Sequence, residues 1–253
     1  MYPAPCLQSI VAPICTYSQV GNAFYVQQLF GTGFFFNTSG FFLTARHVIE
    51  DGMHNASECG HRLGIFLMTD NPKCSLTAPI IEFEFADDPF DIAICKTDYH
   101  VNTWFKLERR TVEVWQDVAT MGYPISTAAQ VVAEYQVQQR VHKGYIQRVI
   151  PQERLSPGSH PDAFELSFPI THGLSGSPLF IYMQSHDAVI GICVGSHKSR
   201  VVDYETVIYK DEKVEAKETS VRIEEFGVAH DVRSILDWRP ACLRGRSLLE
   251  ASA

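Results

Sequence analysis

Three short segments of the chain carry residue types that together could perform nucleophilic catalysis. His47 closely follows an apolar run, and Asp91 directly precedes another. Ser175 lies in the hexapeptide Gly-Leu-Ser-Gly-Ser-Pro at 173–178. A hydroxyl nucleophile needs a base that titrates near neutral pH, which histidine supplies, and a carboxylate that holds the imidazole in one tautomer. The order His, Asp, Ser therefore predicts a serine nucleophile that is activated by a histidine.

Each segment also has an ordinary explanation when it is taken alone. A histidine after a strand is commonly a packed or surface residue, an aspartate commonly marks a strand boundary, and Gly-x-Ser-Gly is a common loop composition. The three segments together, in this order and with these flanking residues, are far more specific than any one of them.

The elements that would position these residues are mostly short strands. Apolar runs rich in Phe, Ile, Val and Tyr recur between Gly, Asn, Asp and Pro residues. The expected strands are 9–15, 23–30, 33–36, 41–44, 63–67, 80–85, 92–96, 118–121, 130–138, 141–149, 163–167, 178–182, 189–195 and 226–230. Many short strands at fairly regular spacing are typical of an all-β sandwich or a pair of barrels. The best helix candidate is 230–239, where Asp231 would be the N-cap.

Changes in composition divide this series of strands. A change near 107–112 separates two β-rich halves, 1–111 with His47 and Asp91, and 112–238 with Ser175.

Two further segments lie outside the regular strand series. The charged residues 197–225 are expected to form a long solvated hairpin inserted before the last strand, which is either a solubilising insertion or a docking element for a regulatory protein. Residues 239–253 are expected to form a tail that is irregular from 243 onward.

The overall composition is that of a soluble globular protein. The chain has 253 residues, of which 45% are hydrophobic and 20% are charged. Its formal net charge of −8 disfavours non-specific binding to nucleic acid or to an anionic membrane. No apolar run is long enough to span a bilayer, and the N-terminal residues do not form a signal peptide. We therefore expect no nucleic-acid or membrane partner.

The cysteines favour a reducing compartment. Their number is odd, and their spacing does not indicate a disulfide framework, so reduced thiols in the cytoplasm are the simplest interpretation. The seven residues are Cys6, Cys15, Cys59, Cys74, Cys95, Cys193 and Cys242.

Several segments in chain order match the motifs of one known family. They are Gly-Thr-Gly-Phe-Phe at 31–35 with Phe-Phe-Leu-Thr-Ala-Arg-His-Val-Ile at 41–49, Asp-Ile-Ala-Ile at 91–94, Gly-Tyr-Pro at 122–124, the hexapeptide at 173–178, and Ile-Gly-Ile-Cys-Val-Gly at 190–195. Over residues 9–238 the chain resembles the trypsin-like peptidases of the chymotrypsin fold. It is most similar to the disulfide-free bacterial branch that includes the Deg-type proteases.

The resemblance implies a fold and a reaction. The expected fold is all-β, with two six-stranded antiparallel barrels and a short C-terminal helix. The expected activity is that of a serine endopeptidase, which forms an acyl-enzyme with a protein or peptide substrate and needs no cofactor or metal. His47 would take the proton of Ser175, Asp91 would orient the imidazole, and the N–H groups of Gly173 and Ser175 would bind the oxyanion.

Two details of these segments qualify the resemblance. Asp87 and Asp88 compete for the role of the acid, and Asp91 is preferred because the apolar strand begins directly after it. Relatives that are activated by N-terminal cleavage have an aspartate just before the catalytic serine, where this chain has Leu174. An apolar side chain cannot form that buried ion pair, so this activation switch is expected to be absent.

The resemblance also locates a substrate pocket. Neither of its two segments contains Asp or Glu, which disfavours cleavage after Arg or Lys and favours a neutral, small or apolar residue. The expected pocket residues are Pro169, Ile170, Thr171 and His172 at the base, and Cys193, Val194 and Gly195 on the wall. His172 is equally well explained as an exposed loop residue. Cys193 is better explained as an inert apolar strand residue than as a reactive thiol.

Other functions find less support. His54, Cys59 and His61 lie close in sequence, but a structural zinc site needs four ligands and no fourth is evident. A catalytically silent chymotrypsin-fold module that binds peptides is the main alternative to an active protease. An RNA-binding role is disfavoured by the acidic balance of the chain.

Overall fold

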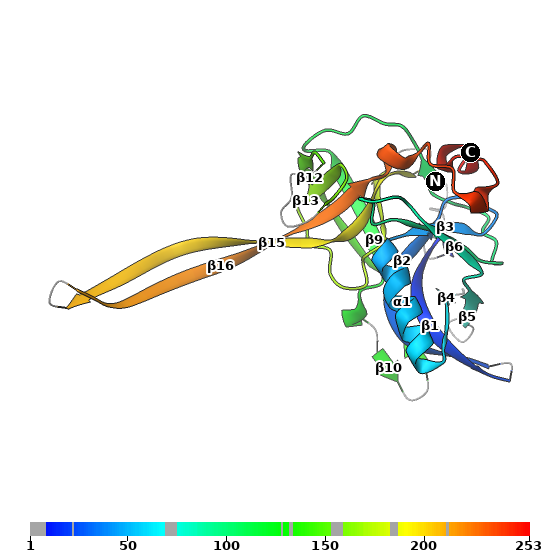
Figure 1. Ribbon diagram of the computed structural model, residues 1–253, viewed down its shortest axis with the longest axis horizontal. Helices are drawn as coiled ribbons and strands as arrows, with labels where there is room; N and C mark the ends of the chain where they lie inside the picture. The colour runs from blue at the N-terminus through cyan, green and yellow to red at the C-terminus, as the bar shows by residue number, and fades with distance from the viewer. Residues whose placement is uncertain are drawn as a thin grey trace, which may run out of the picture.

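A computed structural model describes residues 9–253, except 22, 69–74, 128, 132–133, 153–158, 183–186 and 211–212. Strands dominate the chain, which has two large sheets in one body and a long hairpin that projects from it (Figure 1). The prediction of an all-β protein is therefore confirmed. Of the helices in the described residues, none is both long and apolar enough to cross a membrane.

The first sheet contains the strands of the N-terminal part of the chain. Its strand order is β5-β4-β1-β2-β3-β7-β6, and every neighbouring pair is antiparallel. Its members are β1 (Val11–Val20), β2 (Ala23–Phe35), β3 (Phe41–Thr44), β4 (Arg62–Met68), β5 (Ser75–Pro79), β6 (Glu82–Phe85) and β7 (Ala93–Lys96).

The second sheet contains the strands of the C-terminal part. Its order is β14-β9-β12-β13-β16-β15-β8, with an additional pairing of β14 and β15, and β8 is parallel to β15. Its members are β8 (Lys106–Leu107), β9 (Asp117–Gly122), β12 (Arg140–Ile150), β13 (Ala163–Leu166), β14 (Pro178–Tyr182), β15 (Asp187–Lys210) and β16 (Lys213–Asp231). A separate small pair is formed by β10 (Ala129–Val131) and β11 (Glu134–Gln136), just after the 3-10 turn η2 (Ile125–Thr127).

Within the described residues, each large sheet has seven strands where six were expected. The additional strands are β5 and β8, and neither has a long apolar run that would identify it from sequence. The two expected strands at 23–30 and 33–36 are one continuous strand, β2, because Gly31 and Thr32 continue the pairing with β1.

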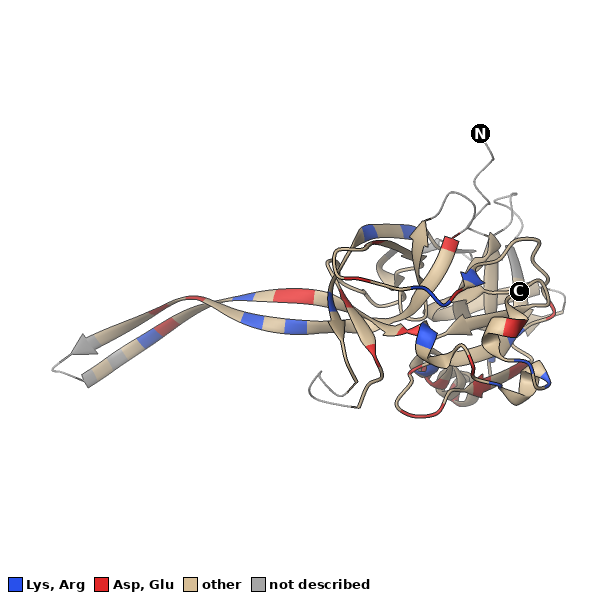
Figure 2. Ribbon diagram, turned by 90° about the horizontal axis from the view of Figure 1, so that it is seen from above, with Lys and Arg blue, Asp and Glu red and all other residues tan. Residues whose placement is uncertain are grey.

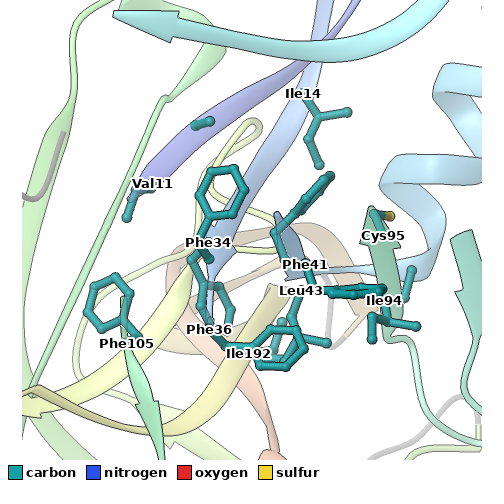
Figure 3. Packing of buried hydrophobic residues seen from close by; sticks show 14 of the residues in the cluster. Val11, Ile14, Phe34, Phe36, Phe41, Leu43, Ile94, Cys95, Phe105 and Ile192 are labelled. Carbon is teal, nitrogen blue, oxygen red and sulfur yellow. The ribbon is translucent and has the colours of Figure 1, made fainter. Parts of the chain in front are cut away.

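The main hydrophobic core consists largely of residues from the half of the chain that forms the first sheet, and it includes several residues of the second sheet (Figure 3). Phe105 connects the two sheets, because its ring lies 5.8 Å from that of Phe34 and 5.3 Å from that of Phe180. Burial of each such aromatic side chain contributes about 1.5–3 kcal/mol. The cluster also contains Val11, Ile14 and Ile192, so residues distant in sequence hold the two halves together.

One α-helix, α1 (Arg46–Cys59), was not predicted from the sequence. Its N-cap is Ala45, whose side chain cannot accept a hydrogen bond, so the usual sequence signal for a helix start is absent. Gly60, in the left-handed conformation at φ 67°, ends the helix. The helix contacts β1, β2 and β4 of the first sheet.

The C-terminal region is more ordered than the sequence indicated. β16 continues to Asp231, and only a 3-10 turn, η3 (Val232–Ile235), occupies the expected helix, although the Asp231 side chain does cap it. The expectation of an irregular tail was wrong. This segment instead contains a second turn, η4 (Ala241–Leu243), and a short helix, α2 (Leu248–Ala251). The Trp104 indole donates a hydrogen bond to the Ser252 carbonyl at 3.1 Å, which ties the C-terminal residues to the body.

The charged segment extends β15 and β16 far beyond the second sheet (Figure 1). We call residues 198–225 the arm, of which 211–212 lie outside the described residues. Both basic and acidic residues are distributed along it (Figure 2). At 3.3 Å per residue, the strand from 198 to 210 reaches about 40 Å from the body.

Candidate functional site

His47 and Asp91 are joined by two hydrogen bonds. His47 is in the first turn of α1, and its Nδ1 lies 2.6 Å from Asp91 Oδ2. The backbone N–H of His47 donates to Asp91 Oδ1 at 2.9 Å. The Asp91 carboxylate therefore supplies the N-terminal cap that Ala45 cannot, and its negative charge stabilises the start of the helix. One side chain thus fixes both the helix and the imidazole.

The electrostatics of this pair favour an ionised aspartate. Burial raises the pKa of Asp91, but the hydrogen bonds from His47 outweigh it and hold the pKa below its usual value. Burial lowers the pKa of His47, but the hydrogen bond to Asp91 and its charge leave the pKa above the ordinary value. In neutral His47, Nδ1–H therefore donates to Asp91, and Nε2 is left as the free base.

The rival aspartates do not contact His47. Asp88 pairs with Arg46 at 3.0 Å, and its side chain is 91% exposed. Asp87 is also exposed, and its carbonyl accepts the N–H of Phe90. Of the three candidates, only Asp91 lies beside the imidazole.

The Ser175 loop packs against the start of α1. Gly176 has φ 85°, and a Cβ there would lie 2.1 Å from both Thr32 O and Thr44 Oγ1. The N–H of Thr32 donates to the Ser175 carbonyl at 2.9 Å. Glycine is required at 176 because the loop approaches the first sheet too closely for any side chain.

The backbone of Ser175 and the side chain of Val48, which follows His47, both lie close to Gly31. A Cβ at Gly31 would lie 2.8 Å from Ser175 O and 2.5 Å from a methyl group of Val48, the residue after His47. The Ser175 hydroxyl donates to Val194 O at 3.3 Å, and among the described residues it makes no hydrogen bond to His47. Nucleophile and base are commonly further apart without substrate than in the reacting complex.

Two backbone N–H groups in the Ser175 loop are fixed in direction but donate no hydrogen bond to a described backbone carbonyl. In the described residues, neither Gly173 N–H nor Ser175 N–H donates to a backbone carbonyl. The carbonyl oxygens on the other side of the same two peptide units accept hydrogen bonds of 2.9 and 3.0 Å from Ile125 and Ser177. Because the C=O and N–H of a trans peptide point in opposite directions, these bonds also fix the directions of the two N–H groups.

The expected pocket base and wall are joined by a side chain that the sequence did not identify. Ser196 Oγ accepts from Ile170 N at 2.7 Å and donates to Ile170 O at 3.1 Å. Pro169 and Thr171 are half-buried, and His172 is exposed. The base segment therefore lies against β15, the strand that also carries the wall segment.

The wall residues differ in their accessibility. The Cys193 side chain is 0% exposed in the second core cluster, and its thiol lies 3.5 Å from Thr120 Oγ1. Burial raises the pKa of this thiol to about 11. Cys193 therefore behaves as an inert core residue and offers the pocket only its backbone, whereas Val194 and Gly195 are half-buried.

Two buried polar side chains with roles at this site were missed by sequence reasoning. Thr32 Oγ1 donates to Gly173 O at 2.7 Å and accepts from Tyr123 N at 3.0 Å. His230 Nδ1 accepts from the backbone N–H of Asp91 at 3.2 Å. Both contacts join residues more than 90 positions apart, and no local pattern marks them.

Other surface features lie away from this site. Depressions of about 430 and 420 Å³ are lined by residues around Tyr17 and Arg62, and around Arg110 and Arg233. Within the part of the chain that the structure describes, no group of three or more His, Cys, Asp or Glu residues could hold a metal ion. His54 instead pairs with Glu58 at 3.3 Å.

Comparison with solved structures shows the fold. The chain is similar to the HtrA-type protease AlgW with a decapeptide, with a TM-score of 0.55, 15% identity and coverage of 90% of this chain and 62% of that one. A variant of AlgW with a decapeptide gives a TM-score of 0.55 at 16% identity with the same coverage. The chain is also similar to Deg5, with a TM-score of 0.51, 18% identity and coverage of 74% of this chain and 80% of Deg5. This chain thus spans less than two thirds of the AlgW chains it matches.

Comparison of sequences shows the family. No curated protein sequence matches the chain. The model of the trypsin-like peptidase domain, however, matches residues 31–192, which is more than half of the chain and includes His47, Asp91 and Ser175. The chain belongs to the trypsin-like peptidase family.

Proposed function

We propose that this protein is a serine endopeptidase with His47, Asp91 and Ser175 as its catalytic triad. The observation that carries the proposal is the paired hydrogen bonding of Asp91 to His47, at the helix start on which the Ser175 loop packs. This arrangement leaves Nε2 of His47 as the base on a rigid element beside a serine.

The proposed reaction proceeds in two halves. Ser175 Oγ turns from the Val194 carbonyl toward His47 Nε2, gives up its proton and attacks the substrate carbonyl. Gly173 and Ser175 donate their N–H groups to the resulting oxyanion. His47 then protonates the leaving amine, and water, activated by the same base, hydrolyses the acyl-enzyme.

The site needs no cleavage of the chain to become ordered. Leu174 is 0% exposed in the second core cluster, so its side chain is held by packing alone. Hydrogen bonds from Thr32 to both Gly173 and Ser175 hold the loop without a new N-terminus. We infer that the oxyanion donors are preorganised in the intact chain.

The substrate is proposed to be a protein or peptide with a neutral residue before the scissile bond. The relative AlgW contains a decapeptide, which supports peptide binding by this fold. The segments 169–172 and 193–195 contain no acidic side chain that would bind Arg or Lys.

The arm is proposed to bind a regulatory protein. Its two strands pair only with each other among the described residues, and isolated hairpins are marginally stable in water. Large apolar side chains along both strands are exposed, which is typical of a surface that another protein covers. They are Val202, Tyr204, Ile208, Val214 and Ile223.

Deletion of 200–222 tests the role of the arm. We expect cleavage of a short peptide to be unchanged, because the arm lies beyond the sheet that carries Ser175. We expect cleavage of the natural protein substrate, or its response to the partner, to change. A folded deletion variant with the same activity and regulation as the full chain contradicts this role.

A cytoplasmic location is proposed from the cysteines. The described cysteines, Cys15, Cys59, Cys95, Cys193 and Cys242, are all unpaired thiols. Cys6 and Cys74 lie outside the described residues. Free thiols persist in a reducing compartment.

The decisive experiment compares the wild-type chain with Ser175→Ala. A fluorophosphonate is expected to label the wild type at Ser175 and not the variant, and N-terminal proteomics should show cleavage products that the variant lacks. Loss of the nucleophile should lower kcat on the order of 10⁶-fold. Binding of peptides without labelling or cleavage would support the alternative, a catalytically silent peptide-binding module.

A further inference from the structure

The Asp91 carboxylate holds His47, but the backbone of Asp91 is itself held by a residue of the second sheet. The N–H of Asp91 donates to His230 Nδ1 at 3.2 Å. Asp91 lies in the loop between β6 and β7 of the first sheet, and His230 is near the end of β16. The contact therefore crosses from one sheet to the other.

The position of His230 on β16 is rigidly defined. β16 lies between β13 and β15, and His230 pairs with Ala163 on one side and Ile192 on the other. Its neighbour Ala229 packs into the second core cluster. Because side chains alternate along a strand, His230 points out of the opposite face, toward Asp91.

The hydrogen bond requires a neutral imidazole. An N–H donor must meet a ring nitrogen with a free lone pair, so the proton of His230 is on Nε2. His230 is 5% exposed, and this burial lowers its pKa to about 4. The charge of Asp91 raises the pKa of His230, and the charges of His160 and His47 lower it. The neighbouring Asp231 carboxylate is paired with Arg233.

We propose that His230 is a positioning residue that holds the Asp91 backbone and, through Asp91, the imidazole of His47. His47 and Asp91 belong to the part of the chain that forms the first sheet, whereas Ser175 and His230 belong to the part that forms the second. His230 thus fixes the base relative to the half of the molecule that carries the nucleophile. This role rests on the proposed triad, although the positioning itself is a property of the fold.

The test uses three single variants and two measurements. His230→Leu fills the site but lacks an acceptor, whereas His230→Asn keeps an acceptor oxygen near the position of Nδ1. His61→Leu is the matched control, since His61 follows the far end of α1, about 20 Å along the helix from His47. The pKa of His47 is measured by NMR of the histidine rings, and kcat and KM are measured with a peptide substrate.

We expect His230→Leu to lower the His47 pKa toward that of an unpaired imidazole. It should reduce kcat by about tenfold to a hundredfold with little change in KM, because misplacement of the base affects the chemical step. His230→Asn should restore both values, and His61→Leu should change neither. Should His230→Leu fail to fold, His230→Ala takes its place in the comparison with His230→Asn.

Two results overturn the proposal. One is a His47 pKa and kcat in His230→Leu equal to those of the wild type. The other is an equal loss in His230→Leu and His230→Asn, which would mean that the acceptor is not what matters. The NMR measurement does not depend on turnover, so an inactive wild type refutes the proposed function while the His47 pKa still decides the role of His230.

Discussion

The Thr32 hydroxyl gives the most direct test of how the nucleophile loop is held. Thr32 is fully buried, and its Oγ1 joins the Gly173 carbonyl to the Tyr123 N–H. Thr32→Val keeps the shape of the side chain and removes both hydrogen bonds. The buried Gly173 carbonyl and the buried Tyr123 N–H each lose the hydrogen bond to this hydroxyl.

The magnitude follows from these two groups. Each buried group that loses its hydrogen bond costs about 1–3 kcal/mol, so the loss of both bonds in Thr32→Val should lower the free energy of unfolding by about 2–6 kcal/mol. Thr32→Ser keeps the hydroxyl and loses one buried methyl group, at a cost of about 1 kcal/mol. Urea denaturation of the two variants and the wild type measures this difference.

Activity should respond more strongly than stability. Release of the Gly173 carbonyl lets the adjacent oxyanion donor move, and loss of such a donor lowers kcat about 10²–10³-fold. Thr32→Val should approach this loss under conditions in which it is fully folded, and Thr32→Ser should stay within a few fold of the wild type. Equal kcat and equal stability for Thr32→Val and Thr32→Ser would refute the reasoning.

Three further outcomes follow from the site. The proposed mechanism requires neutral His47, whose pKa Asp91 raises, so kcat/KM should fall as the pH drops through a value above that of an ordinary histidine. Asp91→Asn should move this fall to lower pH and reduce kcat about 10⁴-fold. A pH dependence of kcat/KM that is unchanged in Asp91→Asn contradicts the pairing of the two residues. Leu174→Asp buries an unpaired carboxylate and should cost about 3 kcal/mol or more in urea denaturation, so a variant as stable as the wild type would mean that an ion-pair partner exists. Iodoacetamide at pH 8 should modify exposed Cys59 in the folded protein and Cys193 only after unfolding, and mass spectrometry that finds Cys193 modified first contradicts its burial.

The fold class was accessible from sequence because strands leave a local signal. Short apolar runs between Gly, Asn, Asp and Pro residues predicted strands that the structure contains, such as β3 at Phe41–Thr44 and β14 at Pro178–Tyr182. Helix α1 was missed because its cap is Asp91, a residue 44 positions away from His47, and not a neighbour in sequence. The C-terminal segment was underestimated because contacts such as that of Trp104 with Ser252 stabilise it from a distance.

The sequence alone predicted which residues have side chains suited to the proposed chemistry. The types, order and flanks of His47, Asp91 and Ser175 are local properties, and they predicted a serine hydrolase site before any distance was known. The tertiary structure showed that, of three neighbouring aspartates, Asp91 lies beside His47. It also showed that the Cys193 side chain points into the core. It also brought Thr32 and His230 to the site, because hydrogen bonds across two sheets depend on where the chain returns in space, which local patterns do not encode.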